Sequence, residues 1–167
     1  MQEIYSDYIK QVSAEYDGVL VCKDGAEVPI NKYIMRCRVP MLRIGEPLDY
    51  DREVVQLLVN YAMKAEFPGP KTYYSQLIRL IKLSTDCENT VIAGYAFALL
   101  IDRMARSDSL DLLLIRYARE TLGEAMAKRL MQEYENEKQR RVGSRYVKLA
   151  LGVFALFALG FILRWQD

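Results

Sequence analysis

Histidine is absent from this sequence of 167 residues. Without an imidazole, the chain lacks the usual general base of serine and cysteine nucleophiles and the commonest zinc ligand. The three cysteines are widely spaced and form no CxxC pair, so neither a disulfide framework nor a zinc site is encoded. The glycines are scattered and form no phosphate-binding loop. We therefore expect no cofactor, no metal and reduced thiols that face the cytosol.

Neither sign of charge predominates, because 23 basic residues meet 22 acidic residues for a net charge of +1. Such a balance gives no electrostatic basis for nucleic acid as the main partner. Acidic residues cluster at Asp49, Asp51 and Glu53, a pattern that also occurs in acid–base and metal sites. The first turn of a helix explains them more simply, since its unpaired N–H groups favour carboxylates. We expect no enzymatic activity, no catalytic residues and no small-molecule substrate.

The most unusual segment is the run from Leu149 to Leu163, which contains no charged residue. As a helix this run is about 22 Å long, whereas about 20 residues are needed to cross roughly 30 Å of hydrocarbon. The flanks supply the difference. Tyr146 and Trp165 are aromatic residues suited to the two headgroup levels, and the charged ends of Lys148 and Arg164 can extend into the interface. These features predict a transmembrane helix over residues 146–165.

A buried helix of a soluble core is the alternative, because short apolar runs usually are core helices. The membrane interpretation is favoured by apolar residues on every side of the helix and by the paired aromatic and basic flanks. The residues expected to form the membrane anchor are Tyr146, Lys148, Leu149, Gly152, Phe154, Phe157, Gly160, Leu163, Arg164 and Trp165.

The orientation of this anchor follows from its surroundings. The first residues carry charges and tyrosines and lack the apolar core of a signal peptide, so we expect insertion after synthesis, as in tail-anchored proteins. Arg140, Arg141, Arg145 and Lys148 precede the span and only Arg164 follows it, which places the N-terminal part in the cytosol. A short span with basic flanks suits the endoplasmic reticulum and the mitochondrial outer membrane alike.

Several segments before the anchor have the three-and-four spacing of amphipathic helices, namely residues 51–63, 73–83 and 109–134. Gly123 is expected to bend or divide the last of them. Residues 89–105 are apolar nearly all round, which predicts a central, buried helix. A breaker at residues 68–70, Pro-Gly-Pro, separates the first two helices.

The N-terminal third has a different pattern. A short amphipathic helix is predicted from Ile4 to Tyr16, and the strand-prone run Val19 to Cys22 then leads into Asp24-Gly25. Asp-Gly between apolar runs predicts a hairpin, since glycine accepts the positive φ of such a turn. We therefore predict an α+β, mainly helical fold with a small N-terminal β-hairpin or sheet packed on a helical cluster, plus a C-terminal transmembrane helix.

One stretch of the N-terminal third, DGVLVCKDGAEVPINKYIMRCRVPMLR from Asp17 to Arg43, resembles the opening of the BTB/POZ domain. The residues in matching places are Asp17, Gly25, Val28, Pro29, Lys32, Ile34, Met35, Pro40 and Leu42. Leu48 to Phe67 resembles the third strand and following helix of that family, with Tyr61 and Met63 in its aromatic pair of positions, and the likeness covers roughly residues 5–105. The resemblance implies a protein-interaction domain that pairs through its N-terminal helix and first strand. Tyr5, Tyr8 and Val12 are then the expected interaction residues.

Three departures from the family pattern limit what this resemblance implies. Asn31 stands in place of the usual histidine, Ala65 stands in place of the usual glycine, and the segment between Leu42 and Leu48 is short. Family members that recruit a cullin-type ubiquitin ligase carry their contact motif in that segment. The resemblance therefore does not extend to a ligase-adaptor role.

A rival resemblance involves MLRIGEPLD, residues 41–49, which is similar to the death-motif helix of the Bcl family of apoptosis regulators. The matching residues are Met41, Ile44, Gly45, Glu46 and Leu48, and an apolar helix and a tail anchor also belong to that architecture. Against it, Pro47 would break the motif helix, the Asn-Trp-Gly-Arg signature is missing, and the predicted hairpin has no place in an all-helical fold. The alternative is thus a tail-anchored apoptosis regulator with a groove-binding helix at residues 35–50.

Together these patterns predict four parts. They are a BTB/POZ-like interaction domain over residues 1–106, a helical extension over 107–138, a basic linker over 139–145 and the anchor over 146–165. The predicted function is that of a tail-anchored, non-catalytic interaction module facing the cytosol, either an adaptor or scaffold or a subunit of a membrane complex. Its expected partners are other proteins, in a homo-dimer or a hetero-complex, and the lipid bilayer.

Overall fold

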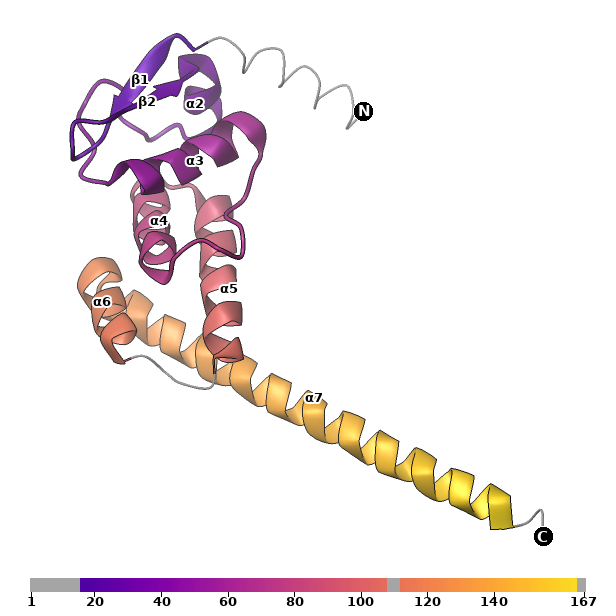
Figure 1. Ribbon diagram of the computed structural model, residues 1–167. Coiled ribbons are helices and arrows are strands. Elements are labelled where there is room, and N and C mark those ends of the chain that lie inside the picture. The colour runs from indigo at the N-terminus through magenta and orange to yellow at the C-terminus, as the bar shows by residue number, and fades with distance from the viewer. Residues whose placement is uncertain (1–15, 108–111, 165–167) are drawn as a thin grey trace.

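The computed structural model describes residues 16–107 and 112–164, with side chains up to residue 144 (Figure 1). Its elements are β1 Gly18–Val21, β2 Glu27–Ile30, α2 Lys32–Arg38, α3 Arg52–Lys64, α4 Tyr74–Asp86, α5 Thr90–Arg106, α6 Leu112–Leu122 and α7 Glu124–Arg164. The described chain is mainly helical with one small antiparallel sheet, as predicted. The expected helix at Ile4 to Tyr16, with Tyr5, Tyr8 and Val12, lies outside the described residues apart from Tyr16.

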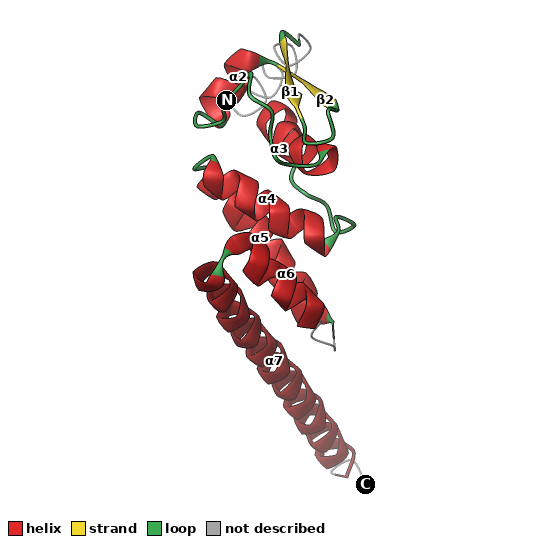
Figure 2. Cartoon of the chain, turned by 90° about the vertical axis from the view of Figure 1, so that its left-hand side faces the viewer, coloured by secondary structure: helices red, strands yellow, loops and turns green. Residues whose placement is uncertain are grey.

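The predicted hairpin is confirmed. Strands β1 and β2 pair antiparallel from Gly18 opposite Ile30 to Val21 opposite Glu27. Gly25 in the connecting turn has a φ of +76°, a conformation that costs an L side chain energy. The small sheet covers one end of the helical layer, above α3 (Figure 2).

The segment expected as a third strand lies along the hairpin without becoming a strand. The backbone N–H of Leu48 donates to the carbonyl of Val21 at 2.8 Å, and Lys23 N–H donates to the carbonyl of Tyr50 at 3.0 Å. Those two hydrogen bonds attach residues 48–50 to the end of β1. Within the described residues the sheet has two strands.

Helix α2 is joined to the hairpin at its first turn. The side chain of Asn31 caps the helix by accepting a hydrogen bond from the N–H of Ile34 at 3.0 Å. A carboxylate oxygen of Asp17, just before β1, accepts a hydrogen bond from Lys32 N–H at 2.6 Å. The start of the described chain is therefore held beside the beginning of α2.

The core lies between the hairpin and the helices. It is formed by the inward-facing side chains of the hairpin and by the apolar face of each helix. The hairpin contributes Leu20, Val28 and Ile30, all fully buried, as the period-two pattern of strands requires. Helices α3 and α4 contribute their apolar stripes, which confirms the helical periodicity of residues 51–63 and 73–83. The fully buried residues of these two helices are Val55, Leu58, Ala62, Leu77, Ile78 and Leu80.

Helix α5 is central, but the expectation that it is buried on all sides is wrong for one face. Ile92, Ala96 and Leu100 recur every four residues and are completely buried. The opposite face is solvent exposed over more than two turns, at Val91, Gly94, Tyr95 and Ala98. Helices α4 and α7 cover only part of the surface of α5, so the apolar surface of this helix exceeds what the described residues bury.

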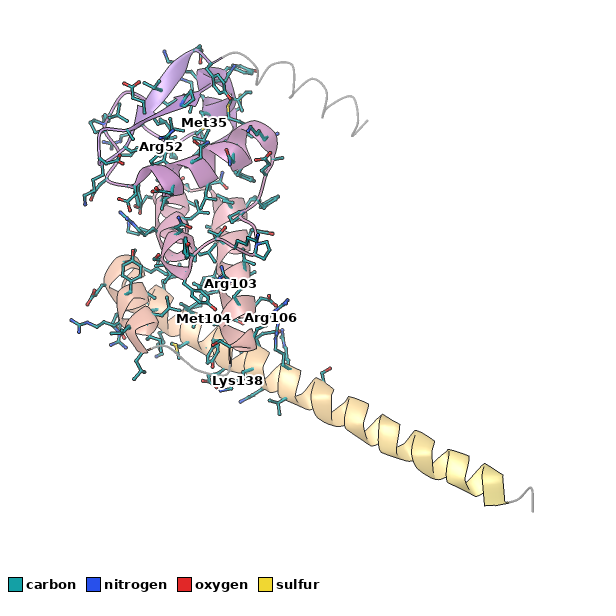
Figure 3. The ribbon with its side chains drawn as sticks, in the orientation of Figure 1. Met35, Arg52, Arg103, Met104, Arg106 and Lys138 are labelled. Carbon is teal, nitrogen blue, oxygen red and sulfur yellow. The ribbon has the colours of Figure 1, made fainter. Side chains whose placement is uncertain are left out.

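Gly123 divides the long C-terminal helical segment, as expected, with a φ of +82° between α6 and α7. Helix α7 then packs Leu130 and Tyr134 against the core, and its Ala127 is also buried. We call the described part of residues 16–141 the head. The point where α7 leaves the head is marked by Arg103 and Arg106 of α5 and by Lys138 of α7 (Figure 3). Residues 139–145, predicted as a linker, are part of α7.

The predicted membrane anchor falls outside what the structure tests. The backbone of α7 continues to Arg164, whereas side chains are described only up to residue 144. Among the residues whose side chains the structure describes, no helix combines the length and apolar character needed to cross a bilayer. The anchor at residues 146–165 stays a prediction from the sequence.

Candidate interaction surfaces

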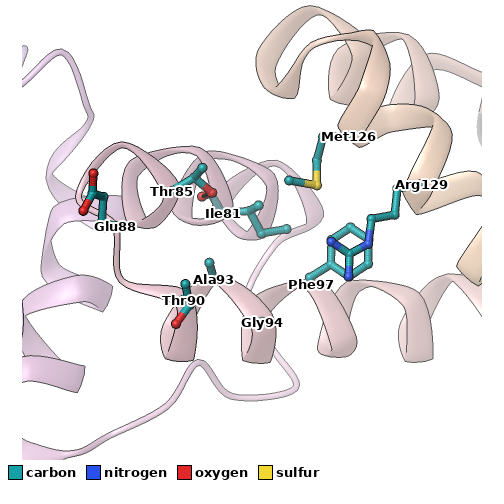
Figure 4. Close-up of a pocket in the computed structure, with 9 residues that line it drawn as sticks. All are labelled: Ile81, Thr85, Glu88, Thr90, Ala93, Gly94, Phe97, Met126 and Arg129. Carbon is teal, nitrogen blue, oxygen red and sulfur yellow. Dashed lines mark hydrogen bonds between the residues drawn. The ribbon is translucent and has the colours of Figure 1, made fainter.

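A hollow runs along the exposed side of α5, and we call it the α5 groove (Figure 4). Its volume is about 640 Å³. It is lined by Ile81 and Thr85 of α4, Glu88 of the following turn, Thr90, Ala93, Gly94 and Phe97 of α5, and Met126 and Arg129 of α7. The consecutive helices α4 and α5 and the later helix α7 thus form a single concave surface.

The floor of the α5 groove is made of small side chains. Ala93 and Gly94 lie at its middle, and a Cβ atom on Gly94 would meet no heavy atom within 4 Å. Thr90 and Phe97, near its two ends, are seven helical residues apart, or about 10.5 Å. The groove is therefore about two helical turns long and open above Gly94.

Opposite charges lie at the two ends of the α5 groove. At one end the Arg129 guanidinium lies 5.5 Å from the centre of the Phe97 ring, in a cation–π contact. At the other end is Glu88, an exposed residue with a φ of +54°. Neither charge makes an ion pair with a described residue. A ligand carrying complementary charges at its two ends would satisfy both.

An aromatic patch lies on the neighbouring side of α5 and consists of Tyr61, Phe67, Val91 and Tyr95. The ring centres of Tyr61 and Phe67 are 5.3 Å apart, and those of Phe67 and Tyr95 are 4.4 Å apart. Despite these contacts, Phe67 remains 42% exposed and Tyr95 remains 41% exposed, and Val91, one helical turn before Tyr95, is 59% exposed. Exposed apolar residues that adjoin in this way usually mark a binding surface.

A second hollow, of about 600 Å³, is polar and lies between α4, α6 and residues 49–50. Its charged groups already have partners. Arg79 binds the Asp51 carboxylate, Lys82 binds Asp86, and the Tyr50 hydroxyl donates to Asp86 at 2.8 Å. Burial, followed by this hydrogen bond, raises the pKa of Tyr50 far above its usual value. The network is internally neutralised and stabilises the packing of its three segments.

The acidic residues singled out in the sequence do not converge on one site. Asp49 pairs with Lys23 at 3.0 Å, whereas Asp51 pairs with Arg79 of α4. Asp51 also begins α3, where its carbonyl accepts hydrogen bonds from Val54 and Val55. Asp51 and Glu53 thus lie at the start of α3, as expected, but the Asp51 carboxylate makes no hydrogen bond to the N–H groups of the first turn. The described residues contain no cluster suited to a metal ion.

The three cysteines are free thiols. Cys22 and Cys87 are buried, and burial is the main cause that raises the pKa of both, that of Cys87 to about 11. Since the thiolate is the reactive form, these two side chains are held in their unreactive state at neutral pH. Cys37 is exposed on α2.

Sequence reasoning missed both surfaces around α5. It placed the interaction residues at Tyr5, Tyr8 and Val12, outside the described residues, and treated α5 as fully buried. A signal was present, since no charged residue occurs between Glu88 and Asp102. That signal alone cannot separate a buried helix from one with an uncovered apolar face.

Comparison of the chain with protein-family models, curated proteins and solved structures finds no match. The resemblances to the BTB/POZ domain and to the Bcl family are therefore carried by the residues of this chain alone.

Proposed function

We propose that this chain is a tail-anchored, non-catalytic protein-interaction module whose head faces the cytosol. The observation that carries the proposal is the uncharged outer face of α5, with the α5 groove on one side and the aromatic patch on the other. A lone soluble head would gain nothing from leaving such a face in water. A partner that covers it gains the free energy of apolar burial.

The anchor part of the proposal is supported by continuity along α7. Arg141 is the last residue for which an interaction with the head is seen, through Asp102 and Glu137. Tyr146, where the predicted span begins, is five residues further on, or about 8 Å along a helix. A bilayer around residues 146–165 would hold the head close to the membrane on a helical stalk.

The BTB/POZ-like interpretation is preferred to the Bcl-like one for a local reason. Residues 18–38 form a hairpin that leads into α2, the order of elements that the first resemblance implies. The death-motif alternative requires a helix through residues 41–49, and the described backbone there is non-helical, with Gly45 at a φ of +104°. In the preferred interpretation the head forms a homo-dimer or hetero-complex, with Tyr5, Tyr8 and Val12 as interaction residues.

The anchor is tested by extraction of cell membranes at alkaline pH, with the full-length chain and a Phe154→Arg, Phe157→Arg variant. We expect the unchanged chain to stay in the membrane pellet and the variant to be released, because charged side chains in the span are costly. Release of both forms, or retention of both, would contradict the anchor.

The interaction module is tested on the full-length chain in mild detergent by light scattering and by isolation of bound proteins. A discrete dimer or a stoichiometric hetero-complex is expected. The variant Tyr5→Ala, Tyr8→Ala, Val12→Ala should weaken that complex, since apolar anchors carry most of the binding energy of such contacts. A chain that stays monomeric and binds no protein at any concentration tested would rule the module out.

A further inference from the structure

The α5 groove has the size and chemistry of a receptor for one short amphipathic helix. It is about two helical turns long. Its floor is formed by the small residues Ala93 and Gly94, and Phe97 and Met126 give it apolar walls. An amphipathic helix enters such a groove with side chains spaced three and four residues apart.

The chain itself contains a segment with matching spacing, residues 4–12. On a helix, Ile4, Tyr8 and Val12 fall on one face and span about 12 Å, close to the length of the groove. The charged residues of this segment share the opposite face. They are Asp7 and Lys10, and Glu3, which immediately precedes the segment, lies on the same side. Docked in the groove, the segment would bury its apolar face and leave its charges in water.

The position of the first described residues brings this segment within reach of the groove. Asp17 is held at Lys32, the first residue of α2, and α2 is about 9 Å long. At the other end of α2 the carbonyl of Arg38 accepts a hydrogen bond at 2.9 Å from Asn89, which adjoins Glu88 and Thr90 of the groove. The extended chain from Val12 to Asp17 spans up to about 17 Å. It therefore reaches the Glu88 end but not the far end.

The charges at the two ends of the groove independently favour the direction that places Val12 at the Glu88 end. With Val12 at the Glu88 end, Lys10 lies toward Glu88 and Glu3 lies toward Arg129, whereas the reverse direction brings like charges together. Glu88 and Arg129 make no ion pair with other described residues, so both charges are available.

From these observations we propose that residues 4–12 dock as a helix in the α5 groove of the same chain, antiparallel to α5. This inference goes beyond the proposed function, because it concerns the lone chain and requires neither a bilayer nor a partner. Its consequence is that Tyr8 and Val12 are covered at rest. A partner that uses these residues or the α5 groove must first displace the segment, so its apparent affinity is lowered in proportion to the fraction of chains that are open.

The test uses an indole as reporter in the full-length chain, in detergent or nanodiscs. Trp165 is the single native tryptophan, so a Trp165→Phe, Tyr8→Trp chain carries one indole on the apolar face of the segment. We expect blue-shifted emission and slow quenching by acrylamide, both unchanged on dilution. The matched control is Trp165→Phe, Glu3→Trp, whose indole lies on the opposite face and should be quenched rapidly.

Variants of the groove then show whether this shielding comes from docking. Gly94→Glu places a carboxylate on the open floor and should lower the docked population by about tenfold or more. Gly94→Ala should leave the shielding intact, because the floor has space for a methyl group. Ala93→Glu gives a second disrupting variant at the middle of the floor, and the head should stay folded because glutamate is a good helix former.

Three results would overturn the inference. In the first, the indole at position 8 is quenched as fast as the control at position 3. In the second, its shielding survives both Gly94→Glu and Ala93→Glu. In the third, shielding disappears on dilution, which would assign the docked segment to a second copy. A chain that fails the membrane or partner tests above can still give the expected result here, so the two proposals fail separately.

Discussion

Arg141 of α7 donates a hydrogen bond to Asp102 of α5, a residue 39 positions earlier in the chain. The same guanidinium binds Glu137 one turn back on α7 at 2.9 Å. Asp102 also pairs with Arg106 at 2.9 Å. These contacts attach the last packed turn of α7 to the end of α5, so the direction in which α7 leaves the head is set by a small charge network.

The first prediction concerns this network. Arg141→Ala should lower the free energy of unfolding by about 1–2 kcal/mol, since it removes hydrogen bonds to two partly buried carboxylates. Arg140→Ala is the matched control, because Arg140 is 79% exposed and lies 4.0 Å from Glu137. Its effect should stay below about 0.5 kcal/mol. Urea unfolding of the two variants measures the difference, and equal effects would show that the network does not hold α7.

The second prediction compares two glycines with different backbone conformations. Gly94 is helical with open space around it, so Gly94→Ala should stabilise the head by about 0.5–1 kcal/mol. Gly123 has a φ of +82°, so Gly123→Ala should destabilise it by about 1–2 kcal/mol. Thermal unfolding of both variants tests the pair. A stabilising Gly123→Ala would mean that α6 and α7 can form one continuous helix.

The third prediction concerns Asn89, which joins α5 to α2. Its side-chain oxygen accepts a hydrogen bond from Ile92 N–H at 3.1 Å, and its amide donates to the Arg38 carbonyl at 2.9 Å. Asn89→Ala should cost about 2 kcal/mol, because it removes a helix cap and a largely buried hydrogen bond. Asn89→Asp keeps the cap but not the donor and should cost less. If denaturant unfolding showed that Asn89→Asp is less stable than Asn89→Ala, this division between the cap and the donor would be contradicted.

The fourth prediction is a loss of stability in mild alkali. Cys87 keeps its proton in the folded state up to a pKa of about 11, whereas an unfolded thiol ionises near 9. Above pH 9 the unfolded chain therefore holds fewer protons than the folded chain, and stability falls as pH rises.

The magnitude follows from the size of the shift. Between pH 8 and pH 10 the loss attributable to Cys87 should be about 1 kcal/mol. Cys87→Ala should reduce the pH dependence by that amount, whereas Cys37→Ala, at an exposed thiol, should not. Unfolding curves at pH 8 and pH 10 measure this change in the unchanged chain and in both variants. If the free energy of unfolding falls by the same amount in all three chains, the burial of Cys87 does not contribute to the pH dependence.

Local chemistry determined much of what the sequence predicted correctly. Asp24-Gly25 indicated the hairpin because few residues other than glycine accept its turn, and Gly123 indicated a break for the same reason. The apolar spacing of residues 51–63 and 73–83 indicated α3 and α4, since a helix repeats every 3.6 residues. Each signal lies within a few residues, so it can be read without knowing the fold.

Tertiary structure alone decided which apolar surface is covered. The sequence shows that α5 is apolar on nearly every side, but α4 and α7 pack against only part of it and leave Val91, Gly94 and Tyr95 exposed. The tertiary structure likewise brings Met126 and Arg129 close to Phe97, and it joins Arg141 to Asp102. Burial is a property of neighbours that are distant in the chain, so it depends on how the elements pack and not on the composition of any one of them.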